Sequence, residues 1–185
     1  MIITTAQTTA DLQGILNLQQ QNLSRNLPPD VQHKQGFLTL QYTLDQMQKM
    51  HELGPSVIAK DGERVVGYAI TAMPGVRAFV PELETLFEML NTIHYEGKPL
   101  SKHPYYVVGQ VCVGDDYRGL GVFDGLYHHH RKTYSDQFRL FITDISARNT
   151  RSLRAHERVG FQVVHQFHEP DAGEEWALVV WDWGK

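Results

Sequence analysis

Residues 110–123 combine the residue types that bind phosphate groups. An apolar run over 107–113 predicts a strand, a turn of glycine and aspartate ends it, and a helical pattern follows. The first turn of a helix has N–H groups without partners in the helix, and its dipole adds positive potential. Gly119 and Gly121 lack a Cβ and let an anion approach the backbone, while Arg118 adds a fixed positive charge. The sequence therefore predicts an anion site between this strand and this helix.

Two well-known phosphate loops do not account for this turn. The Walker pattern needs Gly, four residues and then Gly-Lys-Ser/Thr, and the turn lacks that spacing. The dinucleotide fingerprint G-x-G-x-x-G agrees at Gly119 and Gly121, but Asp124 stands where its third glycine belongs. A nucleotide-binding protein of another fold is therefore disfavoured.

The better match is a third signature. Residues 118–123, Arg-Gly-Leu-Gly-Val-Phe, resemble the (Gln/Arg)-x-x-Gly-x-(Gly/Ala) signature of the GCN5-related N-acetyltransferase (GNAT) family, in which this turn holds the pyrophosphate of acetyl-coenzyme A. Arg118 takes the first position and Gly121 the fourth. Phe123 occupies the sixth, where glycine or alanine is usual, which predicts altered packing beneath the cofactor while the Phe123 backbone N–H remains a donor.

A second block, residues 149–161, resembles the family's second signature, Asn-x-x-(Ala/Ser)-x-x-x-Tyr-x-x-x-Gly-Phe. His156 stands where tyrosine is usual. The two signatures occur in the family's order, each on the expected element. Four positions agree in type and spacing: Asn149, Ser152, Gly160 and Phe161.

The resemblance implies a single α/β domain over residues 1–185, with a bent mixed sheet, helices on both faces, and fourth and fifth strands that splay apart to leave a cofactor slot. The hydrophobic patterns and turn signals are in keeping with that order of elements. They predict strands over 2–5, 56–60, 63–71, 107–113, 138–142 and 174–183, and helices from Thr8 or Thr9 to about Leu23, from about Phe37 to Glu52, and over 81–93.

The resemblance also implies the activity, an acetyl-coenzyme A-dependent N-acetyltransferase in which a neutral primary amine attacks the thioester directly. Backbone N–H groups of the splayed fourth strand would bind the thioester oxygen and the pantetheine amides. The cofactor-binding residues expected on this basis are Val111, Cys112, Val113, Arg118, Gly119, Leu120, Gly121, Val122, Phe123, Asn149 and Ser152.

His156 is the expected catalytic residue. The family's tyrosine at this position is commonly assigned as the general acid for the leaving thiolate, and a protonated histidine would serve with an ordinary pKa near ~6.5. The other interpretation is a histidine that only hydrogen-bonds the cofactor or its own helix. The general base is left open among water and four side chains: Asp144, Glu88, Glu96 and His94.

Composition limits the partners. The 185 residues carry 17 basic and 21 acidic side chains, a net charge of −4, so neither nucleic acid nor an anionic membrane is an expected partner. The start of the chain has no visible secretory signal, and no apolar run approaches the ~20 residues of a membrane helix. Cys112 is the only cysteine, which suits a reducing cytoplasm, and its apolar strand favours packing over nucleophilic chemistry.

Several further features have more than one interpretation. The excursion over 73–105 is either a wall of the acceptor site or a plain surface loop. The histidines over 128–130 suggest a solvated helix face, because consecutive helical residues cannot converge on one metal ion. A strand over 174–183 carrying three tryptophans is either buried or part of a homodimer interface. The basic stripe of the second signature, from which one or two members would reach the 3′-phosphate, comprises Arg148, Arg151, Arg154 and Arg158.

The acceptor amine is not identified by the sequence, and an acyl group longer than acetyl is compatible with it. The unusual residues Phe123 and His156 keep one alternative open, a non-catalytic member of the fold that binds an acyl-coenzyme A as sensor or scaffold.

Overall fold

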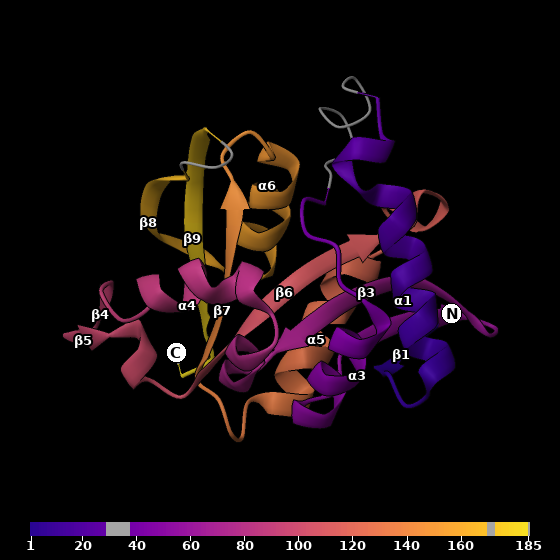
Figure 1. Ribbon diagram of the computed structural model, residues 1–185, viewed down its shortest axis with the longest axis horizontal. Coiled ribbons are helices and arrows are strands. Elements are labelled where there is room, and N and C mark those ends of the chain that lie inside the picture. The colour runs from indigo at the N-terminus through magenta and orange to yellow at the C-terminus, as the bar shows by residue number, and fades with distance from the viewer. Residues whose placement is uncertain (29–37, 170–172, 185) are drawn as a thin grey trace.

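The computed structural model describes residues 1–28, 38–169 and 173–184. Over this part of the chain the main helices and strands follow one another in the expected order, and short 3-10 helices and a small hairpin are added between β3 and β6 (Figure 1). In chain order the elements are β1 (Ile2–Thr5), α1 (Thr9–Asn22), α3 (Leu44–Leu53), β2 (Val57–Asp61), β3 (Arg64–Ala72), α4 (Glu84–Met89), β4 (His94–Tyr95), β5 (Lys98–Pro99), β6 (Tyr105–Val113), α5 (Val122–Tyr134), β7 (Leu140–Ser146), α6 (Thr150–Val159), β8 (Gln162–Glu169) and β9 (Glu174–Asp182).

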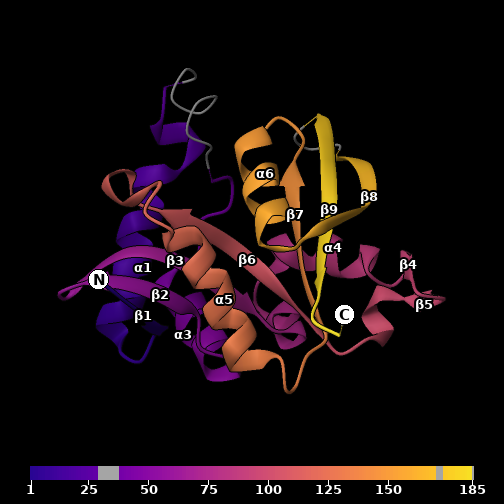
Figure 2. The same ribbon diagram turned by 180° about the vertical axis from the view of Figure 1, so that it is seen from behind.

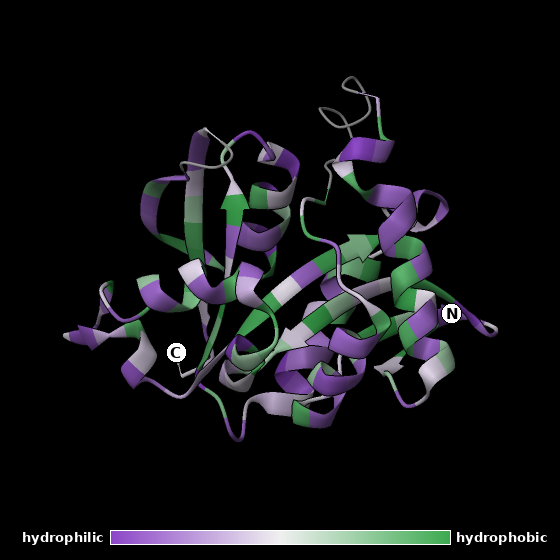
Figure 3. Cartoon of the chain, viewed as in Figure 1, coloured by the Kyte–Doolittle hydropathy of each residue, from purple (hydrophilic) through white to green (hydrophobic). Residues whose placement is uncertain are grey.

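Seven of the described strands form one mixed sheet in the order β1-β2-β3-β6-β7-β9-β8. The β6–β7 pair is parallel, and the other neighbours are antiparallel. Helices α1 and α3 cover one face, and α5 and α6 cover the other, as the two opposite views show (Figures 1 and 2). A hydrophobic cluster fills each side of the sheet, and hydrophobic residues run along the strands (Figure 3). The mixed α/β fold with helices on both faces is confirmed.

Strands β6 and β7, the fourth and fifth long strands, separate along their length. They pair only at one end, where Tyr105, Tyr106 and Val107 lie opposite residues 140–142. Beyond this point β6 continues beside β3 as far as Val113, whereas β7 continues beside β9. The sheet therefore opens into the splayed arrangement that the resemblance implied.

Side-chain caps fix where the first two helices begin. Thr8 accepts a hydrogen bond from the Asp11 N–H at 3.1 Å, and the Asp11 carboxylate accepts from the Thr8 N–H at 3.1 Å, which forms a capping box. Thr43 and Gln46 form the same motif at the start of α3. Helix α3 consequently begins at Leu44, later than the sequence predicted, and Phe37 lies outside the described residues.

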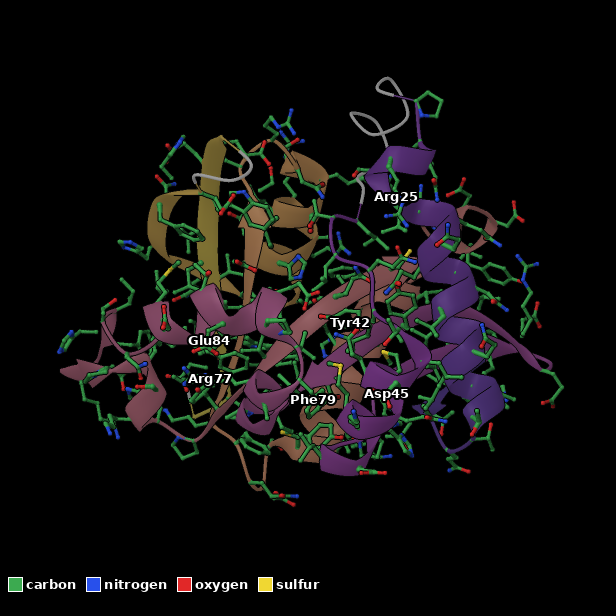
Figure 4. The ribbon with its side chains drawn as sticks, viewed as in Figure 1. Arg25, Tyr42, Asp45, Arg77, Phe79 and Glu84 are labelled. Atoms are coloured by element: carbon green, nitrogen blue, oxygen red, sulfur yellow. The ribbon has the colours of Figure 1, made fainter. Side chains whose placement is uncertain are left out.

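The excursion between β3 and β6 packs against the rest of the domain. Its α-helical part is limited to α4, shorter than the helix predicted over 81–93, because a 3-10 turn precedes it. An ion pair between Arg77 and Glu84 joins two of its segments (Figure 4). The β4–β5 hairpin is fastened by Arg139, which contacts Glu96 at 2.5 Å and Asp182 at 2.7 Å.

The last strands agree with the sequence prediction except at their ends. Strand β7 begins two residues later and ends four residues later than the predicted strand over 138–142, so Asp144 lies within the strand. In β9 and just after it, Trp181 and Trp183 are buried in the cluster on the α5 side and are core residues, whereas Trp176 is only partly buried. Within the described ranges, no helix is long and apolar enough to cross a bilayer.

Candidate active site

A pocket of about 800 Å³ lies where β6 and β7 separate. Three segments supply most of its lining. They are the end of β6 (Val111–Val113), the turn that leads into α5 and its first residues (Arg118, Gly119, Gly121, Val122, Phe123 and Asp124), and α6 with its N-cap (Asn149–Ser152, Arg154, Ala155 and Arg158). The two signatures, some 30 residues apart in sequence, therefore meet in one cavity.

The turn before α5 depends on two glycines with left-handed backbone. Gly119 and Gly121 both have φ of 77°, and a Cβ on either would meet no atom within 4 Å. Conformation rather than space therefore requires glycine at both positions. Gly121 is the N-cap of α5 and makes no side-chain cap, so the first N–H groups of α5 have no capping oxygen from it. This is the geometry of an anion site.

Ten of the eleven expected cofactor residues line this pocket, and Leu120 does not. Leu120 sits between the two glycines and is 63 % exposed, so its side chain is directed to solvent. Its backbone shapes the turn without adding a side-chain contact to the pocket.

Arg118 braces the turn. Its guanidinium donates to the Val113 carbonyl at 3.0 Å and to Asn22 Oδ1 at 3.0 Å, and it pairs with Asp115 at 2.8 Å. Asn22, from the last turn of α1, also lines the pocket. The motif arginine thus connects three elements, and Asn22 is a contributor that the sequence analysis missed, since a single asparagine at a helix end carries no distinctive signal.

Basic residues at the start of α6 face the pocket. The Asn149 side chain accepts from the Ser152 N–H at 3.2 Å and caps the helix, with Arg151 and Arg154 beside it. Arg158 also reaches the pocket but pairs with Asp124 at 2.5 Å. Arg148, by contrast, pairs with Glu174 and is not part of the lining. The predicted basic stripe therefore divides between the pocket and ion pairs elsewhere.

His156 lies behind the pocket wall. It is 1 % exposed and is absent from the lining. Its Nδ1 lies 2.8 Å from the Ser152 carbonyl, which can only accept, so Nδ1 carries the proton. Nε2 then accepts from the Tyr127 hydroxyl at 2.6 Å. Burial lowers the pKa of His156 to about 4, and the ring is neutral at pH 7.

The two residues that differ from the family pattern contact each other. The rings of Phe123 and His156 are 5.1 Å apart at an interplanar angle of 83°, and Tyr127 packs against both. Such edge-to-face packing is favourable for aromatic rings. The two unusual residues, Phe123 in the first signature and His156 in the second, therefore pack against each other as a pair.

Of the four candidate bases, Asp144 is the one within the splayed pair of strands. Burial raises the pKa of Asp144 to about 6. Burial also raises the pKa of Tyr42, and the charge of Asp144 adds to that shift. By strand alternation Asp144 lies on the same face of β7 as Leu140 and Ile142, which belong to the hydrophobic cluster that α1, α3 and α4 share, and it is absent from the pocket lining. Glu96 is instead held by Arg139 at the β4–β5 hairpin, which also carries His94, and Glu88 is exposed on α4.

The prediction of a solvated face for the histidines over 128–130 is wrong for His130. That residue is fully buried, donates from Nε2 to the Ala69 carbonyl at 3.0 Å, and accepts at Nδ1 from the Tyr106 hydroxyl at 3.0 Å. Its position follows from helical spacing, since it shares the buried face of α5 with Leu126. Over the described part of the chain, no group of three acidic, histidine or cysteine side chains is placed to hold a metal.

Cys112 is buried beside the pocket, and burial raises the pKa of its thiol to about 12. A thiol with so high a pKa is protonated at neutral pH and is a poor nucleophile. This agrees with the packing role predicted for it.

Comparison with known proteins places this geometry in a family. Residues 18–161 match the model of the Acetyltransferase (GNAT) family. The chain belongs to this family. No curated protein matches it by sequence. Family membership explains why the first and second signatures face one pocket.

Solved structures show the same fold at low sequence identity. Ribosomal-protein-alanine N-acetyltransferase from Brucella melitensis is similar with a TM-score of 0.62 and 18 % identity, over 98 % of this chain and 99 % of that one. The NatC complex bound to Gag peptide and CoA is similar with a TM-score of 0.65 and 12 % identity, over 98 % of this chain and 97 % of that one. A spermidine N-acetyltransferase chimera from Vibrio cholerae and hSSAT is similar with a TM-score of 0.58 and 11 % identity, over 100 % of this chain and 97 % of that one.

Proposed function

We propose that this protein is an acetyl-coenzyme A-dependent N-acetyltransferase that acetylates a primary amine. The observation that carries the proposal is the pocket between the end of β6 and α6, which has an anion site at one side and, at the other, β6 backbone that no described strand pairs on the β7 side. Acetyl-coenzyme A has matching parts, a pyrophosphate and a pantetheine arm with amide groups.

Each wall of the pocket fits one part of that ligand. The left-handed turn at Gly119 and Gly121 and the first N–H groups of α5 would hold the pyrophosphate. Arg151 and Arg154 supply planar, permanently charged donors for the 3′-phosphate. The backbone of Val111–Val113, which pairs with no strand on the β7 side among the described residues, would pair with pantetheine as an added strand does.

When bound, the thioester supplies an activated acetyl group, and the protein then has to position it and to manage one proton. A backbone N–H of β6 polarises the thioester oxygen as an oxyanion donor. Asp144, with its pKa raised to about 6, is ionised above that pH and can take the proton released as the amine attacks, directly or through water. The bond from the acetyl carbon to nitrogen forms and the bond to sulfur breaks, which releases coenzyme A.

Of the two interpretations of His156 that the sequence left open, the contacts favour the hydrogen-bonding one. A general acid needs a proton to give and a path to the sulfur. The single proton of His156 is engaged with the Ser152 carbonyl, and Nε2 is an acceptor for Tyr127. A thiolate with an ordinary thiol pKa of ~8.5 leaves without an enzyme acid at moderate cost. We propose that His156 supports the pocket wall.

The test is release of coenzyme A thiol from acetyl-coenzyme A in the presence of single amines. The names of the structural relatives mention alanine of a ribosomal protein, a bound peptide and spermidine. The panel therefore contains peptides that begin with alanine, other peptides, and spermidine. Amine-dependent release well above hydrolysis supports the proposal. Tight binding of acetyl-coenzyme A with no release for any amine class would favour the sensor alternative.

A further inference from the structure

Strand β6 contains a bulge at the point where it leaves β7. Val108 pairs with Thr71 and Gln110 pairs with Ile70, so Gly109 has no partner residue on β3. One extra residue reverses the side-chain alternation of everything beyond it. Gln110 and Cys112 therefore face the α1 side, and Val111 faces the α5 side beside the pocket. The bulge thus decides which backbone groups of β6 face the pocket.

A tyrosine hydroxyl holds this bulge from the side of α1 and α3. Tyr42, which is 2 % exposed, donates to the Gly109 carbonyl at 3.0 Å. A Cβ at Gly109 would lie only 2.7 Å from the Tyr42 hydroxyl oxygen, so a glycine is required for this approach. Tyr42 sits near the centre of the molecule just before α3 (Figure 4).

Hydrogen bonds through Gln110 extend the contact to the chain around Tyr42. Gln110 donates from Nε2 to the Leu40 carbonyl at 2.6 Å, and its Oε1 accepts from Tyr68 at 2.8 Å and from Gln19 at 3.0 Å. Gln19 in turn accepts from the Tyr42 N–H at 3.1 Å. These groups are largely buried, where a network with satisfied donors and acceptors fixes one arrangement.

We propose that Tyr42 is a positioning residue for the strand that binds the thioester. It acts through the Gly109 carbonyl, which it holds so that the backbone at Val111–Val113 keeps the orientation that pantetheine and the thioester oxygen require. The inference rests on the proposed function, because it assigns the β6 backbone to the acyl-pantetheine part of the ligand. The phosphate turn takes its left-handed conformation from Gly119 and Gly121, whereas the hydrogen bonds of Tyr42 go to Gly109 and Gln19.

The experiment compares two ligands on two variants by calorimetry. Acetyl-coenzyme A uses the whole pocket, whereas adenosine 3′,5′-bisphosphate has phosphates but no pantetheine or thioester. Tyr42→Phe removes the hydroxyl that holds the half-buried Gly109 carbonyl, so affinity for acetyl-coenzyme A should fall about tenfold. Affinity for the bisphosphate should change less than twofold. Tyr134→Phe is the matched control, because the buried Tyr134 hydroxyl also donates to a backbone carbonyl, that of Pro55, at 2.6 Å.

The outcomes separate the inference from the proposed function. If Tyr42→Phe behaves like Tyr134→Phe, or weakens both ligands equally, the positioning role is refuted. If the wild-type protein binds neither ligand, the proposed function itself fails. Should Tyr42→Phe not fold, Gly109→Ala displaces the same hydroxyl and should show the same ligand selectivity. In a folded Tyr42→Phe protein, adding Gly109→Ala should reduce the affinity for acetyl-coenzyme A much less than it does in wild type, because the added methyl group no longer meets the hydroxyl.

Discussion

The protonation state of His156 can be measured through the stability of the protein. Its folded-state pKa of about 4 lies below the unfolded value of about 6.5, so between these values the unfolded chain binds more protons. The stability that the neutral ring contributes is complete above pH ~6.5 and is lost as the pH falls toward 4. At 1.36 kcal/mol per pKa unit, a difference of about 2.5 units gives a loss of roughly 3 kcal/mol.

A substitution isolates this contribution from other titrating groups. In His156→Gln the amide can donate to the Ser152 carbonyl and accept from Tyr127, but it does not titrate. Asp144, with its raised pKa, stabilises the folded state on acidification below pH 6 and acts oppositely, and buried His130 is common to both proteins. Only the difference between the two stability curves therefore reports on His156.

The assay is urea unfolding of the wild-type and His156→Gln proteins at intervals from pH 7.5 to 4. The wild-type protein should lose roughly 3 kcal/mol relative to the variant across this range. Turnover of the variant at pH 7.5 should stay within a few-fold of wild type, whereas loss of a general acid costs about 10²–10⁴-fold. Parallel stability curves together with a 100-fold loss of kcat would refute the account of His156 and restore its role as the acid.

Three other substitutions test the rest of the site. Gly121→Val forces a branched side chain into a backbone φ of 77°, so the affinity for acetyl-coenzyme A, measured by calorimetry, should fall at least tenfold (about 1.4 kcal/mol). An unchanged affinity in a folded variant would remove the pyrophosphate assignment. Asn149→Ala loses the cap of α6 and should weaken the same ligand less, since the turn before α5 stays intact; a larger loss than for Gly121→Val would reverse this ranking. The wild-type kcat/KM should rise as the pH increases through about 6, because Asp144 ionises there. Asp144→Asn should lower kcat about 100-fold at pH 7.5 and should abolish this rise in kcat/KM. A rise that persists in the variant would point to another base.

Local signals in the sequence predicted the elements that build the pocket. The strand–turn–helix pattern around Gly119 and Gly121, and the capped helix after Asn149, depend on nearby residues, so they could be recognised without a structure. The left-handed conformation of Gly119 and Gly121 was not predicted, because residue type alone does not report φ. The predicted turn and the second signature both line the pocket.

Contacts between distant parts of the chain were beyond sequence reasoning. Whether His156 is accessible depends on Phe123 and Tyr127 packing over it, and a motif position does not report burial. The contact between Tyr42 and Gly109 joins residues 67 positions apart and requires a bulge that no residue pattern announces. The observed site therefore differs from the predicted one in side-chain burial and in strand register, which are tertiary properties.

The central claim, acetyl transfer to an amine in the pocket between β6 and β7, is tested most directly by mass spectrometry of the acceptor. The protein is incubated with acetyl-coenzyme A and each amine of the panel, and acetylated amine is quantified against free coenzyme A. The account predicts one acetylated amine for each coenzyme A released, with both products reduced together in Gly121→Val at limiting acetyl-coenzyme A. Coenzyme A release without acetylated amine, or saturable binding with no product for any amine, would contradict it.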